Sequence, residues 1–207
     1  MSKATLLALA LAAAGTSAHA ADLSYNYVQA DLIGVDINGL GGLGINPDMR
    51  GFDVKGSYAF SESFYAIAGY RDADDDFRLG PMSVNISYSQ FNIGLGYRAE
   101  ATENTDWLLE VEYLDEDFVL RGNGSSERAG DSGYRVATGL RGKASEKVEL
   151  YGKITYSDAN SMGNGAGAHV GAVIGLNETW GITAEYQLDR RDQIDFSQIG
   201  LGVRASF

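Results

Sequence analysis

The last eleven residues, 197–207, constrain the fold most strongly, because apolar and polar side chains alternate there without a break. Side chains of a β-strand point alternately to its two faces, so this segment has one apolar and one polar face. The apolar face carries Ile199, Leu201, Val203, Ala205 and Phe207, and the polar face carries Gln198, Gly200, Gly202, Arg204 and Ser206. A final strand that stops on an aromatic residue is typical of a transmembrane β-barrel, with its apolar face towards lipid and its polar face towards the lumen.

Residues 1–20 have the pattern of a cleaved secretory signal peptide. Lys3 supplies a positive charge, residues 4–14 are apolar except for Thr5, and Ala18 and Ala20 form a small-x-small cleavage site before Ala21. The apolar run is shorter than the roughly 20 residues that a membrane-spanning helix needs. We therefore expect residues 21–207 to form a single domain, exported through the inner membrane and located in the outer membrane of a Gram-negative bacterium.

The charge of the chain excludes some partners. The formal net charge is −12, or −13 once Lys3 is removed with the leader, and this argues against nucleic acid as a partner. Cysteine is absent, so stability must come from hydrogen-bonded architecture and not from disulfides. The sequence contains no motif that calls for a cofactor.

Two-faced segments recur along the chain and predict an all-β fold. The expected strands cover residues 24–37, 51–60, 64–71, 84–98, 106–121, 133–142, 148–157, 166–176, 180–188 and 197–207. Short turns at 61–63, 99–105, 143–147 and 177–179 alternate with mostly longer loops at 38–50, 72–83, 115–132, 158–165 and 189–195. This alternation is typical of an up-and-down antiparallel transmembrane barrel. We expect about ten strands, with eight as the alternative, and leave open which way the side chains of 24–37 and 64–71 face.

Charges of both signs on the polar faces favour a membrane barrel over a soluble periplasmic β-domain, since they can pair across a narrow lumen. The predicted lumen charges are Glu110, Glu112, Arg135, Arg141, Lys153, Glu185 and Arg204. Aromatic residues flank the short turns, where they can form a girdle at the membrane interface. Lumen glycines such as Gly94, Gly96, Gly200 and Gly202 should leave gaps.

Short motifs carry a family resemblance. The segment 21–28, the run 94–97 and the turn 177–181 resemble the Ax21-like small outer-membrane proteins, and parts of the pattern are shared with OmpA/OmpX-like and porin-like barrels. The resemblance implies a fold and a location and carries no catalytic residues. The last strand, with Ile199, Leu201, Val203 and Phe207, also resembles the signal that the outer-membrane assembly machinery reads.

Candidate sites are sparse. His169 is the single histidine after the leader, and no motif joins it to Asp158 in the preceding loop, so we predict no catalytic site. Asp72, Asp74 and Asp76 are weak candidates for divalent cations, because the glycine and glutamate that a calcium loop needs are replaced by Phe77 and Ser83.

These observations predict a non-enzymatic barrel with a structural or surface-interaction role through acidic outer loops. The alternative is a narrow porin for ions or small solutes, and a less favoured hypothesis is an enzyme at the outer rim. The expected partners are outer-membrane lipid and lipopolysaccharide, the assembly machinery and weakly bound divalent cations.

Overall fold

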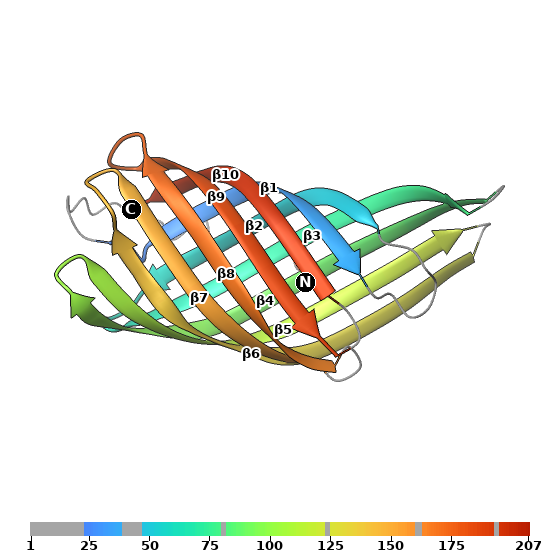
Figure 1. The fold of residues 1–207 in the computed structure, drawn as a ribbon, viewed down its shortest axis with the longest axis horizontal. Coiled ribbons are helices and arrows are strands. Elements are labelled where there is room, and N and C mark those ends of the chain that lie inside the picture. The colour runs from blue at the N-terminus through green and yellow to red at the C-terminus, as the bar shows by residue number, and fades with distance from the viewer. Residues whose placement is uncertain (1–22, 39–46, 80–81, 123–124, 160–162, 193–194) are drawn as a thin grey trace.

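A computed structural model of the chain describes residues 23–38, 47–79, 82–122, 125–159, 163–192 and 195–207. These residues form ten strands and no helix long and apolar enough to cross a membrane (Figure 1). The strands are β1 (Tyr27–Asn38), β2 (Asp48–Ala59), β3 (Phe64–Leu79), β4 (Met82–Thr102), β5 (Thr105–Gly122), β6 (Ser125–Lys143), β7 (Val148–Ala159), β8 (Gly163–Gly175), β9 (Trp180–Arg191) and β10 (Asp195–Ser206).

The ten strands form one closed antiparallel barrel in which each strand pairs with its neighbours along the chain. β10 closes the barrel on β1, with a register that runs from Tyr27 opposite Ser206 to Asn38 opposite Asp195. The predicted all-β up-and-down barrel of ten strands is therefore confirmed. Closure satisfies the backbone hydrogen bonds of both terminal strands, as a barrel in lipid requires.

The barrel has two different ends. The turn end carries the four connections at residues 60–63, 103–104, 144–147 and 176–179, together with the start of β1 and the end of β10. The hairpin end lies opposite, and there β3, β4, β5 and β6 extend beyond the other strands (Figure 1). These four strands are 16 to 21 residues long, whereas the other six have 12 or 13.

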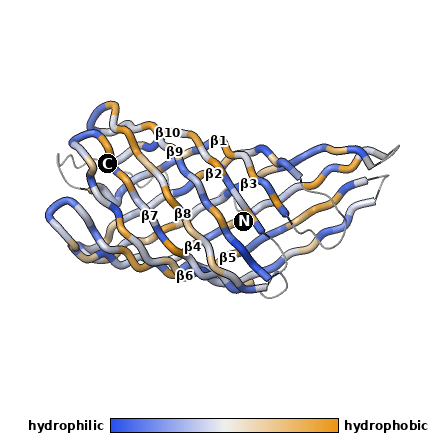
Figure 2. Tube along the Cα trace, viewed as in Figure 1, coloured by the Kyte–Doolittle hydropathy of each residue, from blue (hydrophilic) through white to orange (hydrophobic). Residues whose placement is uncertain are grey.

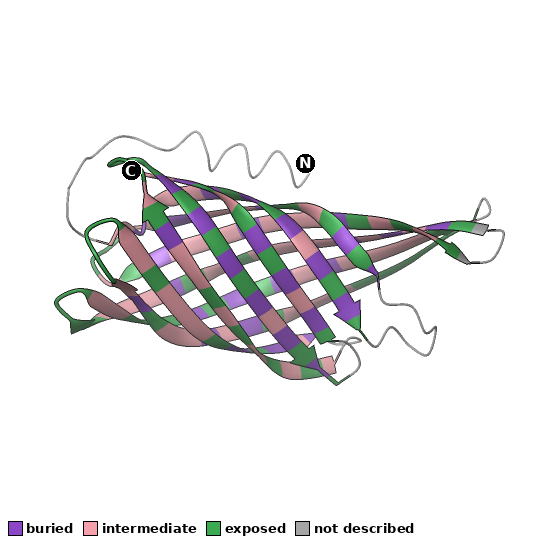
Figure 3. Ribbon diagram, turned by 45° about the horizontal axis from the view of Figure 1, so that its top comes forward, coloured by how far each residue is buried: buried purple, intermediate pink, exposed green. Residues whose placement is uncertain are grey.

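The outside of the barrel is apolar, which is the reverse of a soluble protein. Hydropathy alternates along the strands in Figure 2, and burial alternates with it in Figure 3. Leu32 is 77% exposed and Ile154 is 67% exposed, and the outward side chains of most strands follow the same pattern. Contiguous exposed apolar surface of this kind marks a surface that is covered by something other than water, here the hydrocarbon of a membrane.

Much of three predicted loops is strand. β3 continues to Leu79, β5 and β6 pair from Thr105 opposite Gly142 to Gly122 opposite Ser125, and β9 continues to Arg191. Residues 72–79, 115–122, 125–132 and 189–191 therefore belong to ladders. Their outward side chains are polar because they lie beyond the apolar band, so hydropathy could not distinguish them from loops.

The interior of the hairpin half is lined by apolar side chains. On β1, Gln29 and Asp31 face inwards, and the inward positions that follow are Ile33, Val35 and Ile37. This switch explains why the facing of 24–37 could not be read from alternation. We call the following set the inner apolar cluster: Ile33, Val35, Ile37, Met49, Ala73, Ile86, Tyr88 and Phe196.

Two of the interior glycines accept tyrosine rings. A Cβ atom at Gly96 would overlap the ring of Tyr65, and one at Gly171 would overlap the ring of Tyr151. The expectation that lumen glycines leave gaps is therefore wrong at Gly96, since β3 runs beside it with Tyr65 facing inwards. The facing of 64–71 is resolved in the same way, with Tyr65, Ile67, Gly69 and Arg71 inside.

We expect Gly96→Val to destabilise the barrel, because the new side chain forces Tyr65 out of its packed position. Overpacking of this kind costs about 1–3 kcal/mol of unfolding free energy. Gly34→Ala is the matched control, since a Cβ at Gly34 meets only Ile199 Cγ2, at 3.5 Å. Urea unfolding in lipid vesicles, followed by tryptophan fluorescence, measures both. Equal midpoints for the two variants would contradict the packing described.

Candidate functional site

The predicted lumen charges all lie inside the barrel. Glu110, Glu112, Arg135, Arg141, Glu185 and Arg204 are buried, and the side chain of Lys153 is 18% exposed. The structure brings them together with charges that were not singled out as site residues. Glu116, Asp189 and Arg191 lie in segments expected to be loops, and the sequence offered no pairing signal for Asp31, Lys55 or Glu149.

Glu185 on β9 is the centre of the largest polar cluster. Its carboxylate accepts a hydrogen bond of 2.7 Å from Gln29 Nε2 and further hydrogen bonds from Lys55 Nζ and the Tyr151 hydroxyl. His169 Nε2 lies 3.5 Å from the same carboxylate. A buried carboxylate is stable only when such donors replace water, so Glu185 holds β1, β2, β7 and β8 in one network.

Two smaller clusters connect other strands. Glu110 on β5 accepts hydrogen bonds from Lys153 Nζ at 2.7 Å and from the Tyr65 hydroxyl at 2.9 Å. Glu149 on β7 accepts from both Arg141, at 2.8 and 2.9 Å, and Arg204, at 2.9 Å. Each acid therefore joins strands that are not neighbours in the barrel.

Glu116 spans the interior nearer the hairpin end. Arg191 on β9 donates to its two oxygens at 2.7 and 3.2 Å, although β9 and β5 are not adjacent. The Tyr88 hydroxyl donates at 2.9 Å, and Gln90 Nε2 donates as well. The carboxylate is almost fully buried, so these four hydrogen bonds replace its hydration.

Tyr25 lies across the turn end of the barrel, just before β1. Its ring centroid is 4.9 Å from that of Tyr65, and its hydroxyl donates to Asp106 at 2.8 Å. The guanidinium carbons of Arg98 and Arg141 each lie 4.4 Å from the ring centroid. Burial raises the pKa of Tyr25, so the hydroxyl stays a donor. β1 pairs only with β2 and β10, so Tyr25 reaches β3, β4, β5 and β6 through its side chain alone.

The sequence did not reveal this role of Tyr25. The residue was placed on the polar face of the first strand with Tyr27, where it disturbed the alternation. Two tyrosines at positions i and i+2 on a polar face were the available signal. The structure shows that β1 begins at Tyr27 and that Tyr25 turns into the mouth.

The other candidate residues are not brought together into a site. Asp72, Asp74 and Asp76 share the outward face of β3, Asp72 accepts from Tyr70 and Asp76 accepts from Asn85. No group of three or more metal-ligating side chains occurs within the described segments. His169 faces inwards, whereas Asp158 faces outwards and accepts a hydrogen bond from the hydroxyl of Tyr134.

The residues proposed as an assembly signal occupy the closing strand. Ile199, Leu201 and Val203 point outwards from β10, and Phe207 N donates to Asn26 O at 3.0 Å beyond its end. Their reading by the assembly machinery stays a prediction. The predicted leader, residues 1–20, lies outside the described residues, and its cleavage also stays a prediction.

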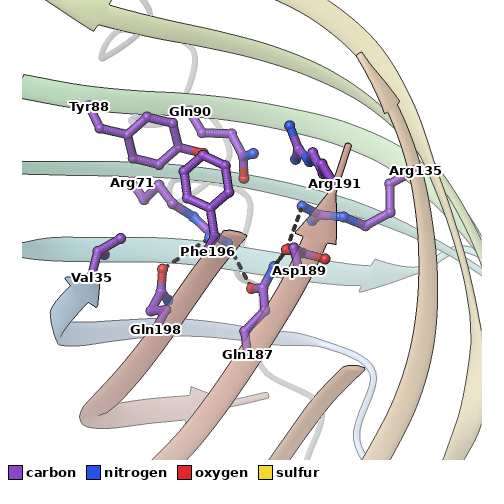
Figure 4. A pocket seen from close by; sticks show the side chains of 10 residues that line it. All are labelled: Val35, Arg71, Tyr88, Gln90, Arg135, Gln187, Asp189, Arg191, Phe196 and Gln198. Atoms are coloured by element: carbon purple, nitrogen blue, oxygen red, sulfur yellow. Dashed lines mark hydrogen bonds and ion pairs between the residues drawn. The ribbon is translucent and has the colours of Figure 1, made fainter. Parts of the chain in front are cut away.

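Two interior cavities are small. One of about 60 Å³ lies between Tyr25, the Glu185 cluster and the Glu110 cluster. The other, of about 10 Å³, is shown in Figure 4, where Arg71, Arg135 and Arg191 converge with Gln90 and Asp189 below Tyr88 and Phe196. The smaller cavity is close to the space that a single water needs, about 10–15 Å³ on this measure.

A comparison with protein families decides the class of this barrel. The family described as "Outer membrane protein beta-barrel domain" matches residues 4–167, which is more than half of the chain. The chain belongs to this family. It is an outer-membrane β-barrel protein, so its apolar outer band lies in a lipid environment. The narrower resemblance to Ax21-like proteins stays a prediction.

Solved structures show the same fold at low identity. Ail, the attachment invasion locus protein of Yersinia pestis, is 14% identical with a TM-score of 0.50, covering 89% of this chain and 100% of that chain. The transport unit of the autotransporter AIDA-I from Escherichia coli is 10% identical with a TM-score of 0.51, covering 99% and 97%. The NanC porin is 10% identical with a TM-score of 0.51, covering 86% and 100%. No curated protein matches the sequence.

We expect Glu116→Gln to destabilise this outer-membrane barrel strongly, because it leaves the Arg191 guanidinium buried without its counter-charge. Breaking a buried ion pair from one side costs about 3–5 kcal/mol. Asp117→Asn is the matched control, since the next residue faces outwards and pairs with Arg128, whose side chain is 67% exposed. Exposed pairs contribute little, so the control should unfold like the wild type. Urea unfolding in vesicles compares them, and an equally small loss in both would show that the interior pair is not important for stability.

Proposed function

We propose that this outer-membrane barrel is a non-enzymatic, non-conducting scaffold that presents the long hairpins of β3 to β6 at the cell surface. The observation that carries the proposal is the interior, which is filled by paired charges and by the inner apolar cluster. Short turns face the periplasm and longer connections face outwards in barrels of this class. The turn end is accordingly assigned to the periplasm and the hairpin end to the outside.

The interior argues against the alternative of a narrow porin. In the hairpin half, Ile37 and Met49 are fully buried in the inner apolar cluster, so this part of the lumen is lined by hydrocarbon. In the turn half, Tyr25 covers the mouth and Glu185 and Glu110 are held by cations. Barrels of eight strands have room only for side chains, and ten strands are close to that limit.

The interior also argues against catalysis. His169 lies mid-barrel, against Glu185 and with its ring 5.2 Å from that of Tyr151, and not at an accessible rim. A rim enzyme needs a histidine with a carboxylate or a nucleophile that meets substrate. The carboxylate that holds His169 is already bound by Lys55 and Tyr151.

The chemistry of the hairpins indicates the kind of partner they fit. On the described strands beyond the apolar band, carboxylates outnumber the arginines Arg78, Arg121 and Arg128; the acidic residues are Asp72, Asp74, Asp75, Asp76, Asp115, Asp117, Glu127 and Asp131. Such a surface attracts a cationic partner, such as a basic protein or peptide, and repels polyanions. The comparison is with Ail of Yersinia pestis, which has been solved in complex with the heparin analogue sucrose octasulfate. We propose the opposite charge preference for this chain.

The barrel in nanodiscs should bind a polylysine-coated sensor and not a heparin-coated one. Replacing Asp72, Asp74 and Asp76 together with asparagine should weaken the polylysine binding by about threefold or more, because the outward acidic row of β3 is lost. Surface plasmon resonance at two salt concentrations measures the effect.

The matched control removes the same charge from the turn end. Glu62, Glu146 and Glu178 are exposed in three of the four turns, and their joint replacement by glutamine should leave polylysine binding nearly unchanged. An equal loss in the two triple variants would show that only net charge matters and would contradict a role for the hairpins. Stronger binding to heparin than to polylysine would overturn the charge preference.

A further inference from the structure

The cavity in Figure 4 contains an unmet hydrogen-bonding demand, independent of the proposed surface role. Among the described residues, Gln90 Oε1 and Arg135 Nη2 are buried without a hydrogen-bond partner, and both side chains line this cavity. Gln90 is 1% exposed, and the side chain of Arg135 is 7% exposed. A buried polar atom left without a partner costs about 1–3 kcal/mol, so each of these atoms calls for one.

The orientation of the Gln90 amide is fixed by its surroundings. Its Nε2 group donates to Glu116, a carboxylate that also receives Arg191 and Tyr88 and can only accept. Turning the amide over would set its oxygen against that carboxylate, which removes a hydrogen bond and adds repulsion. The atom that faces the cavity is therefore an acceptor, and its missing partner must be a donor.

Arg135 supplies the complementary half. Its Nε donates to Ser157 at 3.3 Å, whereas its Nη2 lies 3.8 Å from Asp189 Oδ2, too far for a hydrogen bond. That carboxylate is already engaged by Gln187 at 2.5 Å and by Thr155 at 3.2 Å. The missing partner of Arg135 must therefore be an acceptor.

We propose that this cavity binds one water molecule, which accepts a hydrogen bond from Arg135 Nη2 and donates one to Gln90 Oε1. Only a ligand that donates and accepts at once satisfies both atoms, and the volume of about 10 Å³ suits one water. The water links β4 to β6 between the inner apolar cluster and the polar interior. It completes the hydrogen bonding of the layer that holds Glu116.

The three converging arginines do not make this an anion site. Each guanidinium has its own carboxylate: Arg71 lies 3.6 Å from Asp53, Arg135 lies 3.8 Å from Asp189 and Arg191 lies 2.7 Å from Glu116. The local charge is thereby balanced. A halide also has no proton to donate to Gln90 Oε1, and it is larger than the water that the cavity fits.

A crystal structure of the refolded full-length barrel, from a crystal soaked in bromide, tests the proposal. We expect a water peak within hydrogen-bonding distance of Gln90 Oε1 and Arg135 Nη2, with no anomalous bromide signal there. A bromide peak in the cavity would overturn the assignment, and so would an empty cavity with both atoms bonded to protein.

Two isosteric variants make the test specific. Gln90→Met should lose the water peak, because the donor it satisfies at β4 is gone. Gln29→Met is the control, since that amide is bonded entirely to protein, through Asp31, Glu185 and Arg204, and its loss should leave the water in place. For detergent-solubilised protein, an NMR cross-peak between water and the Gln90 side-chain amide should be present in the wild type. Its absence together with an empty cavity would refute the proposal.

Discussion

Charge pairing inside a narrow, closed barrel is the constraint on which this structure depends. A charged group in the interior cannot keep its hydration, so it must meet an opposite charge or several hydrogen-bond donors. Glu185 and Glu116 show the consequence, because each collects four groups from strands that the backbone ladder does not join. The hydrogen bonds of the sheet define a cylinder, and the side-chain network ties its opposite walls together.

The interior changes character from one end to the other. At the turn end, an aromatic residue that precedes the first strand lies between two arginines, and at the hairpin end aliphatic and aromatic side chains fill the lumen. The paired charges lie between these two regions, with two small cavities. This order separates the tasks of the molecule: the membrane-embedded part is a packed solid, and the polar chemistry that other molecules can meet lies on the projecting hairpins.

The sequence was sufficient for the barrel and its closure, because period-two alternation has one physical meaning in a strand that faces lipid on one side. It also placed Arg135, Glu110 and Glu185 on inward faces. It could not predict the pairs they form, since register and barrel closure decide which residues meet across the lumen. Alternation failed where the environment changed along a strand. Ile33 and Val35 face inwards into an apolar lumen, and Asp115 and Asp117 face outwards beyond the membrane, so neither follows the rule that held in the band.

The central claim is that the interior is closed to ions, and conductance in a planar lipid bilayer tests it most directly. The account predicts that the refolded full-length barrel inserts and remains electrically silent at voltages and salt concentrations where a porin of known conductance gives steps. Discrete steps from the wild-type protein, with a size or ion selectivity that changes in Arg135→Ala or Glu110→Ala, would contradict the account, because they would show that ions pass the charge network.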